Sequence, residues 1–269
     1  MSEEKNVLTP VNPLISALRI PGETFRLPSQ GLFYEEGVFD ESVKNGEIEI
    51  YPMTTIDEII ISTPDKLLSG KAISEIFQHC IPQIKNAYKL LAKDVDYLMV
   101  CLRMVSFGQF MEVVYTHNCK NAKEHTYNVD LQAMIRAAKS IDPTLFTQEY
   151  TCTISNGQKV TLKPMAYGEL IELYQNTMVQ KTDTTDELEA EKMIVDTLVS
   201  VIKDVNGVTE KEFIREWARK ISLGQKKQIQ EAMHAVSEWG VDMKSPQICK
   251  DCKKEVELRV SANPVNFFT

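Results

Sequence analysis

The pattern of hydrophobic and polar positions divides the chain into helical and strand-like stretches. The run Glu47–Met53 alternates, which is typical of a strand that ends at Pro52. Apolar residues three and four positions apart recur through residues 55–105 and again through 166–239, so both regions are predicted to be helical. Residues 110–131 alternate as strands, and Asn156-Gly157 between two alternating runs predicts a tight hairpin turn.

Local residue types predict where several helices begin and end. Thr55 and Thr209 each open a Thr-x-x-Glu pattern, which is typical of a helix start with a capping box. Asp94 is expected to open a longer helix than the one that Pro82 ends or kinks. Asn206-Gly207 is predicted to end the long helix before it, and Gly240 to stop the last helix.

Composition and charge restrict the class of protein. The chain has 269 residues with 30 basic and 38 acidic ones, a net charge of −8. Nucleic-acid binding is therefore unfavoured, and the one compact basic run is Lys250–Lys254. No stretch reaches the roughly 18 apolar residues of a membrane span, and the polar start Met1–Asn6 does not resemble a signal peptide. We expect a cytosolic location, or a particle assembled there, and no membrane.

Cys249 and Cys252 form a Cys-x-x-Cys knuckle that leads into an alternating strand, which is half of a zinc ribbon. A structural zinc ion takes four ligands, so a second half is required. A redox Cys-x-x-Cys normally begins a helix, and the strand that follows here disfavours that interpretation. Cys80 and Cys101 lie in helical apolar patterns and are expected to be buried.

The segment around Cys119 repeats the knuckle in a reduced form. A polar stretch and an alternating strand follow it, as they follow Cys249, but Ala122 stands where a second cysteine would be. The predicted zinc ligands are Cys119, Cys249, Cys252 and His117, with His125 as the alternative to His117. The competing interpretation is a ribbon without metal, held by hydrogen bonds and packing.

These patterns predict an α+β fold with a mostly helical body. A small, discontinuous zinc-ribbon-like β module and an extended N-terminal arm complete it. The predicted regions are the arm over 1–47, a helical region over 48–109, the first half of the β module over 110–165, an inserted helical region over 166–245 and the second half of the module over 246–269.

The chain lacks the motifs of catalysis. Its four histidines offer few partners for a Ser or Cys nucleophile, and no glycine-rich phosphate loop is present. We therefore predict that it is not an enzyme, with no catalytic residue. Apolar residues near both ends are candidates for binding a partner protein, with burial inside the chain as the alternative. They are Leu27, Pro28, Phe33, Tyr34, Phe267 and Phe268.

Three sequence features together indicate a family resemblance. The first is the run Leu27–Tyr34, which reads Leu-Pro-Ser-Gln-Gly-Leu-Phe-Tyr. The second is the pair of runs Ile48–Glu58 and Thr63–Gly70, and the third is the cysteine knuckles with the terminal Asn-Pro-x-Asn-Phe-Phe. Together they resemble the baseplate hub and hub-assembly proteins of T4-type contractile-tailed bacteriophages, whose pattern at the first run is Leu-Pro-Ser-x-Gly-x-x-Tyr. The resemblance implies a non-enzymatic role through contacts with other hub or tail proteins. It also implies a zinc ribbon, from which Ala122 is a departure.

The first functional hypothesis is therefore a structural or assembly protein of a phage baseplate hub. It would be either a virion component or a chaperone that leaves the particle, made in the host cytoplasm. The alternative is a cytosolic zinc-ribbon regulator that binds nucleic acid through the knuckle and Lys250, Lys253 and Lys254. The acidic balance and the lack of interleaved aromatic and basic residues count against the alternative.

Overall fold

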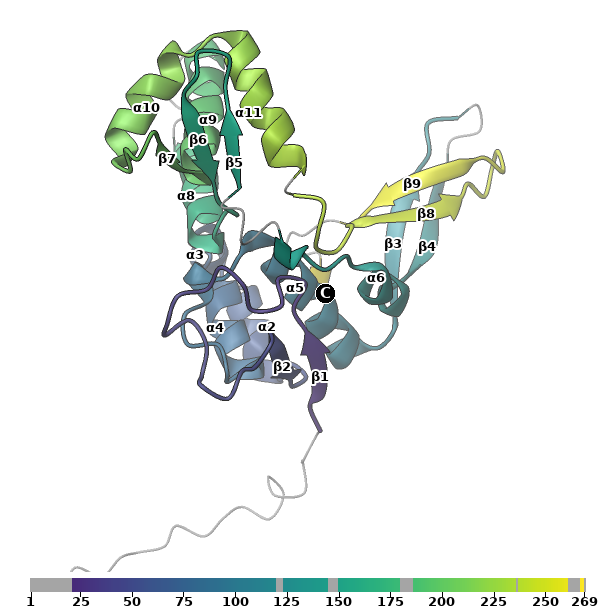
Figure 1. Cartoon of the computed structure of the whole chain (residues 1–269). Helices are drawn as coiled ribbons and strands as arrows, with labels where there is room; N and C mark the ends of the chain where they lie inside the picture. Colours follow the sequence, from purple (N-terminus) through teal and green to yellow (C-terminus); the bar gives the residue numbers. More distant parts are fainter. Residues whose placement is uncertain are drawn as a thin grey trace, which may run out of the picture.

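The chain is seen in a computed structural model that describes residues 21–119, 123–144, 150–179, 186–235, 237–260 and 267–268. It has a mixed α/β structure whose strands form four small antiparallel sheets within these ranges. Figure 1 shows a helical body, a second unit above it that combines a sheet with helices, and two hairpins to one side. No helix among the described residues is both long and apolar enough to cross a membrane.

The first half of the chain forms the body and the first side hairpin. Its elements are β1 (Glu23–Arg26), β2 (Glu47–Ile50), α2 (Thr55–Ile61), α3 (Pro64–Leu68), α4 (Lys71–Cys80), the 3-10 helix η1 (Ala87–Lys89), α5 (Ala92–Phe107), β3 (Phe110–Thr116), β4 (Glu124–Asp130) and α6 (Leu131–Ala137).

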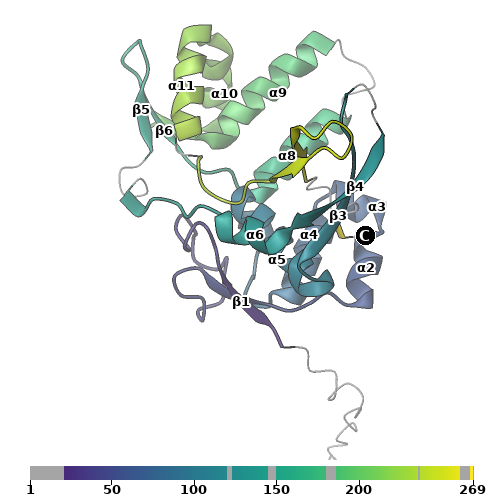
Figure 2. The same cartoon turned by 90° about the vertical axis from the view of Figure 1, so that its right-hand side faces the viewer.

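The second half forms the upper unit and the second side hairpin. Its elements are β5 (Thr151–Thr153), β6 (Lys159–Leu162), α8 (Tyr167–Val179), α9 (Asp186–Val201), β7 (Ile202–Val205), α10 (Lys211–Lys220), α11 (Leu223–Ala235), β8 (Lys244–Ile248) and β9 (Glu255–Arg259). Figure 2 shows α9, α10 and α11 stacked above α4 and α5.

Helix α5 is the centre of the body. Its residues Leu98, Val100, Cys101 and Leu102 are fully buried in one core with α4, β2 and the loops between them. Cys80 is buried in the same core, so the predicted burial of both helical cysteines is confirmed. A core this close-packed gives the body a single arrangement on which the side hairpins can be held.

A second core joins β5, β6 and β7 to α9, α10 and α11. The hairpin predicted at Asn156-Gly157 is confirmed, because β5 and β6 pair around that turn and Gly157 has a φ of 83°. The long helix, however, ends at Val201, before the predicted stop at Asn206-Gly207. Ile202 and Val205 instead form β7 and pair with β6, because branched side chains fit a sheet edge better than a helix end.

Other predicted boundaries shift for local physical reasons. Thr54 and not Thr55 caps α2, since its N–H donates to the Asp57 carboxylate at 2.7 Å. Glu210 and not Thr209 is the residue before α10. Strand β2 ends at Ile50, because the next N–H, from Tyr51, donates to the Cys80 carbonyl at the end of α4.

Two predicted helix boundaries near α5 and α11 were also displaced. Asp94 lies inside the first turn of α5, which begins at Ala92, and its carboxylate is buried. Helix α11 ends at Ala235, whereas Gly240 pairs its backbone with Lys139 further on. The predicted division of the chain into five regions stays a prediction.

The segment Leu27–Tyr34 follows β1 as a series of turns. Its Gly31 passes close to Gly46, both with positive φ, and a Cβ on Gly46 would lie 2.7 Å from the Gly31 nitrogen. Glycine is required at this crossing because any side chain would separate the two backbones. The N–H of Ile141 donates to the Pro28 carbonyl at 2.9 Å, which ties the segment to the chain after α6.

Candidate metal centre

Two hairpins that lie far apart in the sequence lie side by side in space. Strands β3 and β4 form one, and β8 and β9 form the other. Figure 1 shows the second hairpin lying across the first. A small core of Tyr127, Cys249, Val256 and Leu258 fills the space between them, with Cys119 and Cys252 at its margin.

The hairpin ends bring four potential metal ligands together. His117 and Cys119 follow β3, whereas Cys249 and Cys252 follow β8. The ligand atoms of all four residues lie within 4.8 Å of one another. The structure thus brings His117 and not His125 into the group, and Ala122 lies outside the described residues.

The turn after β8 is held by its own backbone. The N–H of Cys249 donates to the Lys254 carbonyl at 2.8 Å, and the N–H of Lys253 donates to the Cys249 carbonyl at 3.0 Å. Lys253 has a φ of 61°, the left-handed conformation that closes the turn. These hydrogen bonds lie within the turn itself and hold Cys249 close to Lys253 and Lys254.

Cys249 is set up to act as a thiolate. Its side chain is fully buried, yet its pKa is lowered to about 6, first by a hydrogen bond from the backbone N–H of Cys252. The N–H of Asp251 and the His117 side chain act in the same direction, and burial opposes them. The Cys252 sulfur lies 3.4 Å from His117 Nδ1. Thiolate and neutral imidazole are the forms that bind a metal.

Asp251 joins the two hairpins beside the cluster. Its Oδ2 lies 2.9 Å from His125 Nε2 and 3.3 Å from the N–H of Lys123, which donates to it. The His125 imidazole, so close to the carboxylate, lowers the pKa of Asp251. His125, the alternative ligand in the sequence, therefore pairs with Asp251 across the two hairpins, and we call this contact the clasp. Asp251 was not among the predicted site residues, although its position between Cys249 and Cys252 could have indicated a role beside the cluster.

The lysines of the knuckle turn toward the chain itself. Lys250 Nζ donates to the Thr126 carbonyl at 2.5 Å and lies over the Tyr127 ring at 5.3 Å. Lys253 Nζ donates to the Lys250 carbonyl at 2.9 Å. Of the three lysines on which the nucleic-acid hypothesis depended, Lys250 thus links the two hairpins and Lys253 bonds within its own turn.

The predicted partner-binding residues lie in the body core or between the body and the upper unit. Leu27 and Pro28 are buried, and Phe33 and Tyr34 are half-buried between the body and the upper unit. Phe267 and Phe268 are 0% and 4% exposed in the body core, with ring centroids 5.2 Å apart at 90°. The core that holds them also includes Met111 of β3 and Val129 of β4.

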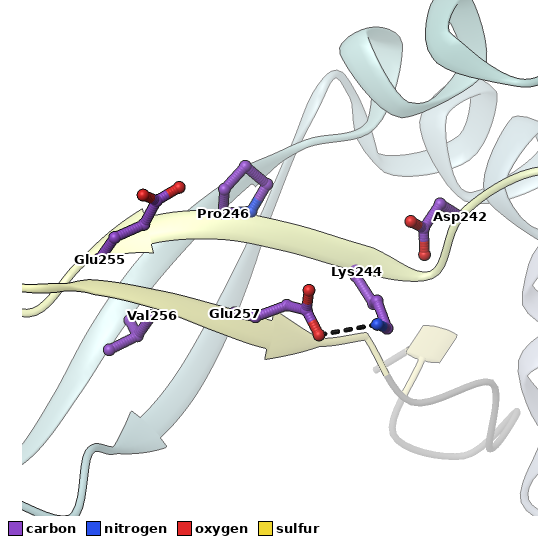
Figure 3. A pocket seen from close by; sticks show the side chains of 6 residues that line it. All are labelled: Asp242, Lys244, Pro246, Glu255, Val256 and Glu257. Carbon is purple, nitrogen blue, oxygen red and sulfur yellow. Dashed lines mark ion pairs between the residues drawn. The ribbon is translucent and has the colours of Figure 1, made fainter.

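A depression of about 390 Å³ lies on the second hairpin (Figure 3). Its lining combines charged and apolar side chains, and Lys244 pairs with Glu257 at 2.8 Å across it. The lining residues are Asp242, Lys244, Pro246, Glu255, Val256 and Glu257. None of them belongs to the Cys/His cluster.

The donor set fits a tetrahedral structural metal ion. Zinc–sulfur bonds of about 2.3 Å place two ligand sulfurs roughly 3.8 Å apart around a tetrahedral ion. Ligand atoms within 4.8 Å of one another need only a small contraction to reach that spacing. Three sulfur ligands and one imidazole are a known structural zinc set.

Comparison with known proteins decides the family. Residues 37–269 match the family model described as T4 bacteriophage base plate protein. The chain belongs to this family. The match includes both hairpins and both cores of the baseplate protein, so the resemblance seen in the sequence is confirmed at the level of the family. The Leu27–Tyr34 segment precedes the matched residues. No curated protein and no solved structure matches the chain.

Proposed function

We propose that this baseplate protein acts by binding other proteins while the baseplate hub of a contractile-tailed phage is built. The observation that carries the proposal is the family match, which spans residues 37–269 and therefore every described helix and strand after β1. The role needs no catalysis. Burial raises the pKa of Asp94 to about 6, and that carboxylate is bonded to its own chain, as a structural group would be.

The hub role has two forms, and one experiment separates them. The protein is either retained in the tail baseplate or released after assembly in the host cytoplasm. Purified particles are tested for the chain by mass spectrometry, beside particles from phage in which its gene is interrupted. Presence in wild-type particles supports a virion component. Absence from particles together with incomplete baseplates in the mutant supports a chaperone. Normal baseplates without the chain would refute the proposal.

We also propose that zinc binds at the Cys/His cluster and joins the two hairpins as a ribbon. Cys119, Cys249 and Cys252 would supply thiolates, and His117 would supply an imidazole nitrogen. The support is the shared position of the four ligand atoms and the lowered pKa of Cys249. A bound zinc ion would supply cross-linking and no chemistry, since all four positions are occupied by protein.

Metal analysis of the protein purified without chelators tests the zinc proposal. We expect about one zinc ion per chain, as four protein ligands complete a structural site. Cys252→Ser should lose most of the metal. Cys152→Ser is the matched control, because Cys152 lies half-buried in β5 and outside the cluster, and it should retain the metal. Protein without zinc but with both hairpins folded would favour the interpretation of a ribbon held by packing.

The role of the six predicted contact residues in binding a partner stays a proposal, and we propose an indirect one. Because most of their surface is inside the chain, we propose that they influence partner binding by holding the body, the upper unit and the terminal residues in place. A direct contact would require these side chains to leave the core.

A further inference from the structure

Strand β3 carries large apolar side chains on an exposed face. Phe110 and Val114 are 60% and 58% exposed, and Glu112 and Thr116 on the same face are also exposed. Met111, which points to the other face, is 6% exposed. Alternation of this kind is expected for a half-buried strand, but its outer face is normally polar.

The backbone groups of the same exposed residues point away from β4. The N–H of Leu131 donates to the Gln109 carbonyl at 2.9 Å, so this pair faces inward across the hairpin. In an antiparallel ladder, inward-facing and outward-facing residues alternate along each strand. Phe110, Glu112 and Val114 therefore turn both N–H and C=O toward the outer edge of β3.

The outer edge of β4 is covered, whereas that of β3 is open. The carbonyls of Asn128 and Thr126 accept hydrogen bonds from Gln247 Nε2 at 3.3 Å and Lys250 Nζ at 2.5 Å. No hydrogen bond is seen from the outward backbone groups of Glu112 or Val114 to any residue in the described part of the chain. An open, apolar edge strand is a template for pairing with another chain.

The charge on this edge favours a basic partner. Glu112 is the one charged residue of β3, and it makes no ion pair with a described residue. In an antiparallel pairing with a second copy, Glu112 would face Phe110, Glu112, Val114 or Thr116 of that copy and would gain no positive charge. Two chains of net charge −8 also repel each other.

We propose that β3 is completed by an extended segment of a different protein, whose apolar residues alternate with a Lys or Arg. The added strand would bond to the backbone of Glu112 and Val114 and place its cation beside Glu112. Its apolar residues would cover Phe110 and Val114. The proposal rests on the proposed function only in taking the partner to be a protein.

The probe for the test is the peptide Thr-Val-Thr-Lys-Thr-Val-Thr, which places valines and the lysine on one face of a strand. Its matched control is the same peptide with Glu for Lys. Binding to the full chain is followed by the amide NMR shifts of Glu112 and Val114. We expect the Lys peptide to bind roughly fivefold more tightly than the Glu peptide, because opposite charges on neighbouring strands attract. Glu112→Lys should reverse this preference.

Two further variants separate edge pairing from charge alone. Val114→Pro removes an outward N–H without removing a bond to β4, so the variant should fold and lose both peptides. Glu255→Lys makes the same charge change on exposed β9 and should keep the preference for the Lys peptide. Equal binding of both peptides, or no binding of either at millimolar concentration, would overturn the proposal. So would concentration-dependent self-association that Val114→Pro abolishes, since the occupant would then be a second copy. None of these results depends on the phage test of the proposed function.

Discussion

The hydroxyl of Tyr34 donates a hydrogen bond to the buried carboxylate of Asp94 at 2.8 Å. The same hydroxyl accepts the N–H of Leu91 at 3.0 Å, and the N–H of Ser29 donates to the other carboxylate oxygen at 3.1 Å. One acid in the first turn of α5 thus holds both ends of the Ser29–Tyr34 stretch. The Leu-Pro-Ser-x-Gly-x-x-Tyr run is therefore explained by folding, through its serine, its glycine and its tyrosine.

Tyr34→Phe should destabilise the protein by about 1–3 kcal/mol, because it removes the donor to Asp94 Oδ2 and the acceptor of the Leu91 N–H, both in a buried setting. The free energy of unfolding from urea titration measures the effect. Tyr174→Phe is the matched control, since Tyr174 is 59% exposed, and it should change the free energy by less than about 0.5 kcal/mol. Equal effects of the two variants would contradict a role for the Tyr34 hydroxyl.

The stability of the protein should depend on the ionisation of Asp94. Burial raises its pKa to about 6 from an ordinary value of 3.8, so the folded state binds the proton more tightly than the unfolded state. The contribution of Asp94 to stability therefore increases as the pH falls from about 7 to about 4. A shift of about two pKa units corresponds to about 3 kcal/mol. Asp96, whose pKa burial also raises to about 6, acts in the same direction.

Exposed carboxylates with lowered pKa values, such as Asp40, destabilise the fold at low pH in the wild type and in the Asp94→Asn variant alike. The difference between the two proteins therefore isolates the contribution of Asp94. We expect the unfolding free energy of the wild type, minus that of the variant, to increase as the pH falls from 7 to 5. Unfolding in urea at several pH values measures it. A difference that stays constant over this range would show that Asp94 does not change protonation there.

Asp251→Ala should weaken zinc binding without removing a ligand. The carboxylate holds His125 and the N–H of Lys123 beside the cluster. Because neither residue is a ligand, the loss should be smaller than the 10–100-fold typical of groups bonded directly to a ligand. Competition with a coloured zinc chelator measures the affinity. Glu255→Ala, on the exposed face of β9, is the control and should leave the affinity unchanged. If Asp251→Ala and Glu255→Ala bind zinc with the same affinity, the contact between Asp251 and His125 does not influence the metal site.

The parts of the fold that could be predicted from the sequence depend on short-range patterns. Helical spacing identified α4 and α5, and Asn156-Gly157 identified its hairpin, because these signals lie within a few neighbouring residues. The ligand set at the hairpins was also accessible, since Cys-x-x-Cys fixes one pair and a similar segment around Cys119 pointed to the rest.

The parts that could not be predicted depend on partners far away in the sequence. Ile202 continues a helical stripe, and its place in β7 is decided by the free edge of β6, some forty residues earlier. Asp94 resembles a helix cap, and its true partners Ser29 and Tyr34 lie about sixty residues before it. The clasp between Asp251 and His125 has the same origin, since no local pattern connects the two knuckles.

Phe267 is expected to be a core residue whose loss affects folding before it affects any partner. Its ring is fully buried beside α5 in the body core, and its carbonyl accepts a hydrogen bond from the Arg103 guanidinium at 2.6 Å. Phe267→Ala should lower the free energy of unfolding by about 3–5 kcal/mol, the cost of removing a buried aromatic ring. Phe213→Ala is the matched control, since Phe213 is 63% exposed, and its effect should stay within about 0.5 kcal/mol. Urea unfolding of both variants decides the matter. If Phe267→Ala unfolds like wild type and yet fails to bind baseplate partners, the terminal aromatics act at an interface and their place in the core is dispensable.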